Sequence, residues 1–185
     1  MSFNSTPLFG GAITVSLPAN FGDASQIRQI PDHQEVFLDA DGFTSIVFEI
    51  LEWVDKPSDE QALQYHFQDL IEDTGDSTNV LDQSEAVMLH VADKPVYTLN
   101  YIQTPPAQTG EQRRPQADFI SIHLVLLRLK EKGTDILATV NVPHYPEQYV
   151  KVEGGKATKL MEDGEAVKEK ILQTFEIKDW GLFDA

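Results

Sequence analysis

Three carboxylates stand close together in residues 21–37, a short polar segment that reads FGDASQIRQIPDHQEVF. They belong to Asp23, Asp32 and Glu35, and Arg28 is the only Lys or Arg of the segment. Fixed carboxylates suit ionic pairing with Lys or Arg of a partner, because arginine can bind a carboxylate through two parallel hydrogen bonds. The competing interpretation is a solvated loop without a partner, and composition alone favours it.

The elements that flank these carboxylates decide whether the charges are fixed. The Asp23 side chain is expected to cap a short helical turn. Pro31 and Asp32 predict a tight turn that leads directly into a strand at residues 34–38. Because charges held on a rigid element lose less entropy on binding, Asp32 and Glu35 would make a better docking surface there than in a flexible loop.

No other group of residues forms a recognised catalytic or metal-binding motif. The five histidines have none of the spacings of a zinc site, and the absence of cysteine excludes thiolate catalysis and disulfides. His66 and Asp69 could share a metal ion only with further ligands, while His123 falls in an expected strand and is interpreted as a core residue. Glu49 and Glu52 share one strand at odd spacing, which points them to opposite faces and makes a poor acid–base pair. A Ser–His–Asp triad stays open, because only three-dimensional geometry reveals it.

The charge balance of the chain restricts its partners. The 185 residues carry 14 Lys and Arg against 30 Asp and Glu, which gives a net charge of −16 at pH 7. A field of this sign opposes binding to nucleic acid, favours a basic partner and disfavours self-association, so we expect a monomer. The apolar-rich run at residues 119–129 contains His123 and Arg128 and is too short and too polar to cross a bilayer. No signal peptide is evident, so a nuclear or cytoplasmic protein is expected.

Hydrophobic periodicity predicts about seven strands and two main helices. The expected strands lie at residues 8–17 (a pair that turns at two glycines), 34–38, 45–54, 86–91, 95–103, 117–129 and 135–142. One helix should begin after Ser58, where Gln61 completes a capping box, and the other near Asp163. Residues 104–116 and 143–155 are expected to be loops.

These elements favour an α+β fold. Long strands that are mostly joined by hairpins, with helices beside them, predict an α/β/α sandwich. Its centre would be a mostly antiparallel sheet of six or seven strands, flanked by helices. A chain of 185 residues is long enough to bury a core of this kind, and we expect one domain over residues 1–185.

The order of motifs along the chain resembles the Mog family of Ran guanine-nucleotide release factors. The residues that carry the resemblance are 8–13, Pro18, Phe21, 23–25, Arg28, 31–32, 34–36, 45–47, 49–52, 65–67, 69–70, 126–129, 134–135 and 141–143. The resemblance implies the fold of the extrinsic photosystem II proteins of the PsbP-like superfamily. It also implies that the protein binds the GTPase Ran in its nucleotide-free or GTP-bound form, promotes nucleotide release and supports nuclear protein import. The protein is expected in both nucleus and cytoplasm.

The resemblance also assigns site residues. The acidic Ran-binding positions of the family fall on Asp32 and Glu35, and Gln34, Asp23 and Arg28 stand in the same motif. Arg28 is expected to pair with Asp23 or Asp32 and to brace the loop. A release factor needs no chemistry of its own, so neither a catalytic residue nor a cofactor is expected.

Two functions from other classes stay open. The protein could be a non-catalytic adaptor that docks other proteins without changing nucleotide release. It could also be a small-molecule-binding or hydrolytic α+β domain. The latter requires a deep pocket with converging polar groups and a histidine or carboxylate of perturbed pKa.

Overall fold

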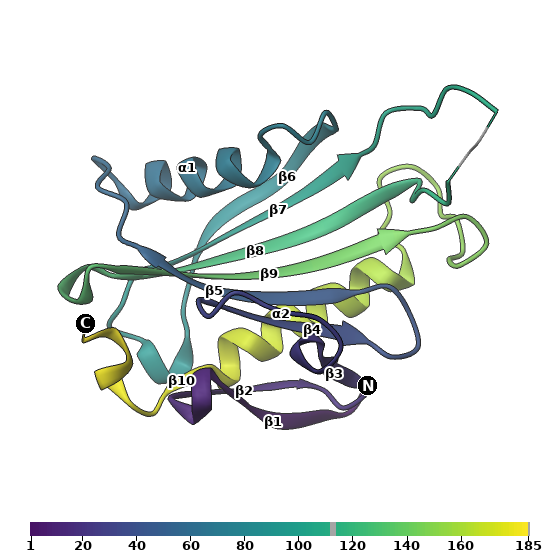
Figure 1. Cartoon of the computed structure of the whole chain (residues 1–185). Coiled ribbons are helices and arrows are strands. Elements are labelled where there is room, and N and C mark those ends of the chain that lie inside the picture. The colour runs from purple at the N-terminus through teal and green to yellow at the C-terminus, as the bar shows by residue number, and fades with distance from the viewer. Residues whose placement is uncertain (112–113, 185) are drawn as a thin grey trace.

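The computed structural model describes residues 1–111 and 114–184, and its centre is a large antiparallel sheet with a layer on each face (Figure 1). Helix α1 (Asp59–Ile71) covers one face. Helix α2 (Lys159–Thr174) covers the other face together with a small three-stranded sheet. The predicted α+β sandwich is therefore confirmed, and the separate small sheet is a feature that periodicity did not reveal.

Seven strands form the large sheet, and every pair of neighbours in it is antiparallel. In spatial order they are β3 (Phe21–Asp23), β4 (Gln34–Asp39), β5 (Ser45–Glu52), β9 (Thr134–His144), β8 (Phe119–Leu129), β7 (Val96–Thr104) and β6 (Ser77–Ala86). The small sheet has the order β1 (Phe3–Leu8), β2 (Ile13–Pro18) and β10 (Glu176–Ile177). The pair expected at residues 8–17 is present as the β1–β2 hairpin, which turns at η1 (Phe9–Gly11).

Two hydrophobic clusters fill the spaces on either side of the large sheet. On the α1 side, Phe67 of the helix belongs to one cluster with strand residues such as Leu124. On the α2 side, Ile171 belongs to the other with strand residues such as Phe48. Gly164 lets α2 approach the sheet closely, because a Cβ at this position would lie 2.8 Å from a side-chain carbon of β9.

The expected strand at residues 86–91 does not form. The chain enters the sheet earlier, as β6, whose sequence STNVLDQSEA is mostly polar and exposed. Pairing with β7 holds this strand, so no apolar alternation marks it in the sequence. Met88 and Val91 are buried at the two ends of a short 3-10 turn, η3 (Leu89–Val91), and this spacing produced the apolar pattern that suggested a strand.

Helix α2 begins at Lys159 rather than near Asp163. The hydroxyl of Thr158 caps the helix by accepting a hydrogen bond from the backbone N–H of Met161 at 3.1 Å. Asp163 lies inside the helix and forms an ion pair with Lys159. The loop expected at residues 104–116 begins where β7 ends, and its residues 112–113 lie outside the part of the chain that the structure describes.

An ionic cluster lies buried where β8 and β9 meet the start of α1. The Arg128 guanidinium donates hydrogen bonds to Asp135 Oδ1 at 3.0 Å and to Asp59 Oδ1 at 2.9 Å. Its carbon lies 3.4 Å from the ring centroid of Trp53. The other Asp135 oxygen accepts a hydrogen bond from His66 Nε2 at 2.8 Å. Because Arg128 is 1% exposed and Asp135 is 0% exposed, each charge depends on its partners rather than on water.

A second buried polar group lies under α2. His123 of β8 donates from Nδ1 to Asn100 Oδ1 at 2.8 Å, and the same nitrogen lies 3.4 Å from Glu165 Oε2. The Asn100 amide in turn donates to Asp82 at 2.8 Å. Burial lowers the pKa of His123 to about 4, although Glu165 opposes the shift, while Lys168 lowers the pKa further. His123 is thus the core residue expected from the sequence, and it is held neutral.

We expect replacement of Arg128 by Met to destabilise the fold by about 3–5 kcal/mol, because Asp135 would remain buried without its cation. Lys132→Met is the control, since it removes an ion pair with Asp184 in which both side chains reach solvent. Urea unfolding of the three proteins measures the difference. Equal losses of stability in the two variants would show that the buried cluster is no more important than a surface pair.

We also expect protonation of His123 to weaken the fold. The unfolded chain binds this proton near pH 6.5, whereas the folded protein binds it only near pH 4. The free energy of unfolding should therefore fall as pH drops from 6.5 to 4, by at most about 1.4 kcal/mol per pH unit from this group. Urea unfolding across that range should show a shallower pH dependence in His123→Gln than in the wild type. The exposed His90→Gln is the control, and an unchanged pH dependence in His123→Gln would refute the assignment.

Candidate functional site

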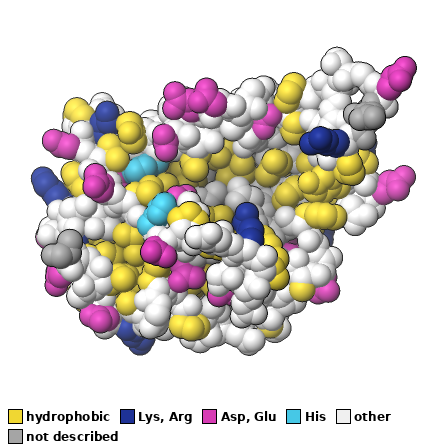
Figure 2. Space-filling view, viewed as in Figure 1, with side chains coloured by type: hydrophobic (Ala, Val, Ile, Leu, Met, Phe, Trp, Pro, Cys, Tyr) yellow, Lys and Arg dark blue, Asp and Glu magenta, His cyan; other side chains and the backbone are white. Residues whose placement is uncertain are grey.

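The candidate site lies on the segment that joins β3 to β4 and on the start of β4. We call it the acidic surface, and it consists of Asp23, Arg28, Asp32, Gln34 and Glu35. In the space-filling view, acidic side chains are spread over the face of the molecule drawn in Figure 2, and basic ones are few. The net charge of −16 adds a long-range field of the same sign.

The first part of the acidic surface is a capped helical turn, as predicted. Asp23 Oδ1 accepts a hydrogen bond from the backbone N–H of Ser25 at 2.8 Å, which caps the 3-10 turn η2 (Ala24–Gln26). The backbone N–H groups of Ile27 and Arg28 both donate to the carbonyl of Ala24, at 3.1 and 3.0 Å. The Asp23 side chain therefore holds the backbone in place.

Arg28 does not brace this loop through an ion pair as expected. Its side chain is exposed and has no carboxylate within ion-pair distance in the described part of the chain. The physical reason is that Asp23 already accepts a backbone hydrogen bond and that backbone contacts close the turn. Arg28 is left as an exposed cation beside the carboxylates.

Asp32 combines a fixed backbone with an unengaged side chain. The turn around it is closed by a hydrogen bond of 3.0 Å from Gln34 N to the Pro31 carbonyl. The turn is tied to the large sheet by a second hydrogen bond of 2.9 Å, from Ile50 N of β5 to the His33 carbonyl. The Asp32 carboxylate is exposed and accepts no hydrogen bond from any described residue. It is therefore available to a partner at little cost in backbone entropy.

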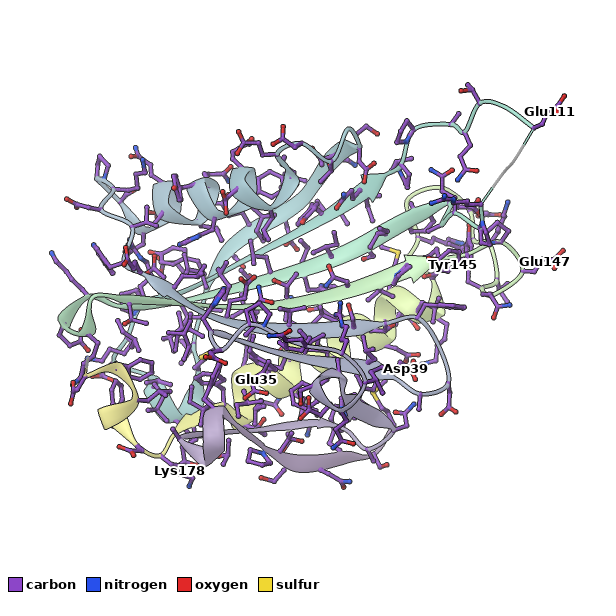
Figure 3. All side chains as sticks on the ribbon, viewed as in Figure 1. Glu35, Asp39, Glu111, Tyr145, Glu147 and Lys178 are labelled. Atoms are coloured by element: carbon purple, nitrogen blue, oxygen red, sulfur yellow. The ribbon has the colours of Figure 1, made fainter. Side chains whose placement is uncertain are left out.

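Glu35 is half-buried and is held by the N-terminal hairpin. Its Oε1 accepts a hydrogen bond of 2.7 Å from the backbone N–H of Phe9, so the side chain joins β4 to η1 (Figure 3). Phe9 has φ 50°, which is unusual for a residue other than glycine, and Gly10 follows with φ 69°. A charge-assisted bond at this point stabilises a strained turn and fixes the carboxylate. The second oxygen, Oε2, has no hydrogen bond within the described residues.

Gln34 faces the opposite side of β4 from Glu35, because successive residues of a strand alternate in direction. Its amide donates to Glu49 Oε2 of β5 at 3.0 Å. Gln34 therefore fixes the position of Glu49 and does not share a surface with Glu35. The five predicted residues are thus placed on one short segment, but the structure separates Gln34 from the face that carries Glu35.

Two contributors to this region had escaped the sequence analysis. One is Phe9, whose backbone N–H fixes Glu35 from a position far away in the chain. The other is Ile27, which is 77% exposed and adjoins Arg28. An apolar side chain among charged ones is typical of a protein interface, where a small apolar centre is bordered by polar groups. The apolar side chain of Ile27 between polar neighbours was the only indication of this exposed residue in the sequence.

The two histidines that come nearest to a metal-binding or catalytic role, His66 and His144, are engaged within the fold. No three His, Cys, Asp or Glu residues among them are grouped so that they could hold a metal ion. His66 is engaged with Asp135 rather than with Asp69, which removes the partial metal motif. His144, whose pKa is lowered by burial, is closed off beneath Phe119 and bonded to Thr158. None of the helices described is long and apolar enough to cross a membrane.

Comparison with known proteins identifies the family of the chain. A family model described as "Ran-interacting Mog1 protein" matches residues 6–143, a range that contains the whole acidic surface. The probable Ran guanine nucleotide release factor of Dictyostelium discoideum is 28% identical over 189 residues, which cover 98% of this chain and 97% of that protein. The nuclear import protein MOG1 of Saccharomyces cerevisiae is 27% identical over 194 residues, which cover 99% of this chain and 86% of that protein.

Solved structures agree with this assignment at the level of the fold. The Ran-binding protein Mog1p of Saccharomyces cerevisiae superimposes with a TM-score of 0.77 at 24% identity, over 99% of each chain. Cyanobacterial PsbP from Synechocystis superimposes with a TM-score of 0.55 at 11% identity, over 95% of this chain and 92% of the other, which confirms the predicted PsbP-like fold. Since the family model matches well over half of the chain, this protein belongs to the Mog1 family of Ran-interacting proteins.

Proposed function

We propose that this protein binds the GTPase Ran, promotes release of its guanine nucleotide and thereby supports nuclear protein import. The observation that carries the proposal is the match to the Ran-interacting family over a range that includes the acidic surface. The names of the relatives, a Ran guanine nucleotide release factor and a nuclear import protein, agree with it. We also propose that residues 1–185 act as one domain and as a monomer, present in nucleus and cytoplasm.

The proposed activity needs no catalytic residue and no cofactor. A protein that binds nucleotide-free Ran more tightly than loaded Ran must weaken nucleotide binding by the same factor, because binding free energies are reciprocal. A hundredfold effect requires only about 2.7 kcal/mol of differential affinity. A rigid surface that recognises one state of the GTPase is therefore sufficient, and we infer that the protein is not an enzyme.

Asp32 and Glu35 are the proposed centre of the Ran-binding surface. The Asp32 carboxylate is exposed, and Glu35 Oε2 is unengaged while Oε1 is fixed by the hairpin. Both would pair with Lys or Arg of Ran that are freer to do so when nucleotide is absent or loosely held. Arg28 would border this pair as an exposed cation, whereas Asp23 and Gln34 contribute by holding the segment. High ionic strength would slow association, because exposed charges are screened within about 8 Å at physiological salt.

An adaptor that docks other proteins without changing nucleotide release is the second candidate. The exposed Ile27 beside the charges would serve either function equally well. The rate of nucleotide release separates the two, because an adaptor has no preference among the nucleotide states of Ran and so shifts no equilibrium.

We expect the double variant Asp32→Lys, Glu35→Lys to slow the assisted release of nucleotide from Ran by at least about tenfold, since attraction becomes repulsion at both positions. The measurement is loss of a fluorescent guanine nucleotide from loaded Ran in excess unlabelled nucleotide. Asp69→Lys, Glu72→Lys is the matched control, because these acidic residues are also exposed but lie at the end of α1, which covers the other face of the large sheet. Unimpaired release by the first variant would exclude the acidic surface as the site.

Glu35→Gln and Glu35→Ala should separate the charge of Glu35 from its hydrogen bond to Phe9. Glutamine keeps an oxygen that can accept from Phe9 N, so the free energy of unfolding should change little. Alanine leaves that N–H without its partner and should cost about 1–3 kcal/mol. Both variants lose the charge, so both should slow release. Normal release by Glu35→Gln would mean that Glu35 acts through the turn alone.

A further inference from the structure

Strand β6 forms one edge of the large sheet and has an unpaired outer side (Figure 1). It spans ten residues, nine of them exposed, and no described residue forms a hydrogen bond to the outer main-chain groups of the strand. Natural sheet edges of this length are usually protected by charged side chains, above all lysine, by proline, by bulges or by a covering segment. In β6 there is neither lysine nor proline, and the single irregularity is a bulge at Leu81.

Two hollows lie along β6 on the side of the sheet that α2 covers. The first has a volume of about 460 Å³ and is lined mainly by apolar side chains, among them Leu81, Ile102, Phe119 and Met161. The bulge turns Leu81 into its wall, and Leu81 is 50% exposed. The second has a volume of about 450 Å³ and is bounded by residues 84–87 and 89 on one side and by α2 on the other.

The spacing of the hollows matches an extended chain. The first borders α2 near its start, at Met161, and the second borders it around residues 168–173. At 1.5 Å per helical residue, this separation corresponds to roughly 14 Å. Four residues of a strand span about 13 Å, and residues four apart point to the same face. One peptide strand laid against β6 could therefore place a side chain in each hollow.

We propose that β6 accepts an extended peptide segment of a partner protein as an eighth strand, with apolar side chains at alternate positions and Lys or Arg between them. Main-chain hydrogen bonds to the free edge supply affinity, and the two hollows select the alternate side chains. The site is separate from the acidic surface, which lies near the opposite edge of the sheet, and it does not depend on the function proposed above.

Charge selects the kind of partner. The edge and the bordering turn of α2 carry Asp82, Glu85 and Glu169. Two described lysines border the hollows, and both are paired: Lys168 is buried against Glu165, and Lys156, in the wall of the first hollow, pairs with Glu153. A basic peptide complements this edge. A second copy of the protein does not, because antiparallel pairing of two β6 strands would bring the acidic residues of both copies together under a net charge of −16 on each.

The test uses the whole protein and a fluorescent peptide of about twelve residues that alternates valine with lysine, long enough to reach both hollows. Anisotropy should show saturable binding, and hydrogen exchange should show new protection of β6 amides. Because the lysines of the bound strand point away from the hollows, toward the face where Glu85 contacts Tyr97, the variant Glu85→Lys should weaken binding severalfold, while Glu52→Lys should leave it nearly unchanged. A peptide with glutamate in place of lysine should not bind.

Three results would overturn the proposal. Protection that appears elsewhere than on β6 would place the peptide at another site. Equal binding of a peptide with the same composition but consecutive valines would show attraction by charge alone, without strand pairing. A dimer of the protein itself in sedimentation, with its β6 amides protected in the absence of peptide, would identify the second copy as the occupant of this edge.

Discussion

The paired charges of Arg128 and Asp135 are the interaction on which the rest of this structure depends. The two residues stand opposite each other in the β8–β9 ladder, so a register shift of one residue would separate them. Both are almost wholly buried, and burial of a charge is costly unless its hydrogen bonds are satisfied. The guanidinium contacts Asp59 at the start of α1 and the Val54 carbonyl, while Asp135 accepts from Val54 N and from His66. One ion pair thereby fixes a hairpin, the end of β5 and the placement of α1.

The same constraint reaches the acidic surface through the sheet. Strand β5 is held beside β9 along its full length, and β4 is paired to β5 in turn. The His33 carbonyl accepts from Ile50 of β5, so the turn that carries Asp32 is attached to the middle of the large sheet rather than to its edge. Glu35 adds a link to the small sheet through Phe9. A surface fixed from both layers loses little entropy when a partner binds, which suits a protein that acts by differential binding alone.

The sequence predicted the fold where local signals and packing agree. The Ser58 cap of α1, the Asp23 cap of η2 and the strand at Gln34 were all marked by residues whose local chemistry requires those elements. It failed at β6 because an exposed edge strand is held by hydrogen bonds to β7 and needs no apolar pattern. The prediction of an ion pair for Arg28 was wrong for a related reason. The carboxylate of Asp23 already accepts a hydrogen bond from a backbone N–H, so it does not turn toward the nearby arginine. The bond from Phe9 to Glu35 lies beyond any local pattern, because it joins the turn of the β1–β2 hairpin to a strand of the large sheet, 26 residues further along the chain.

The position of Glu35 shows why one residue can carry both a structural and a binding role. A carboxylate has two oxygens and about four acceptor sites, so a single backbone N–H cannot exhaust it. The bond to Phe9 consumes part of this capacity, stabilises a turn with positive φ and at the same time removes the rotamer freedom of the side chain. Binding through the remaining oxygen then costs less entropy than binding through a free glutamate would. The stability of the turn at Phe9 and the readiness of Glu35 for a partner are thus two consequences of the same hydrogen bond.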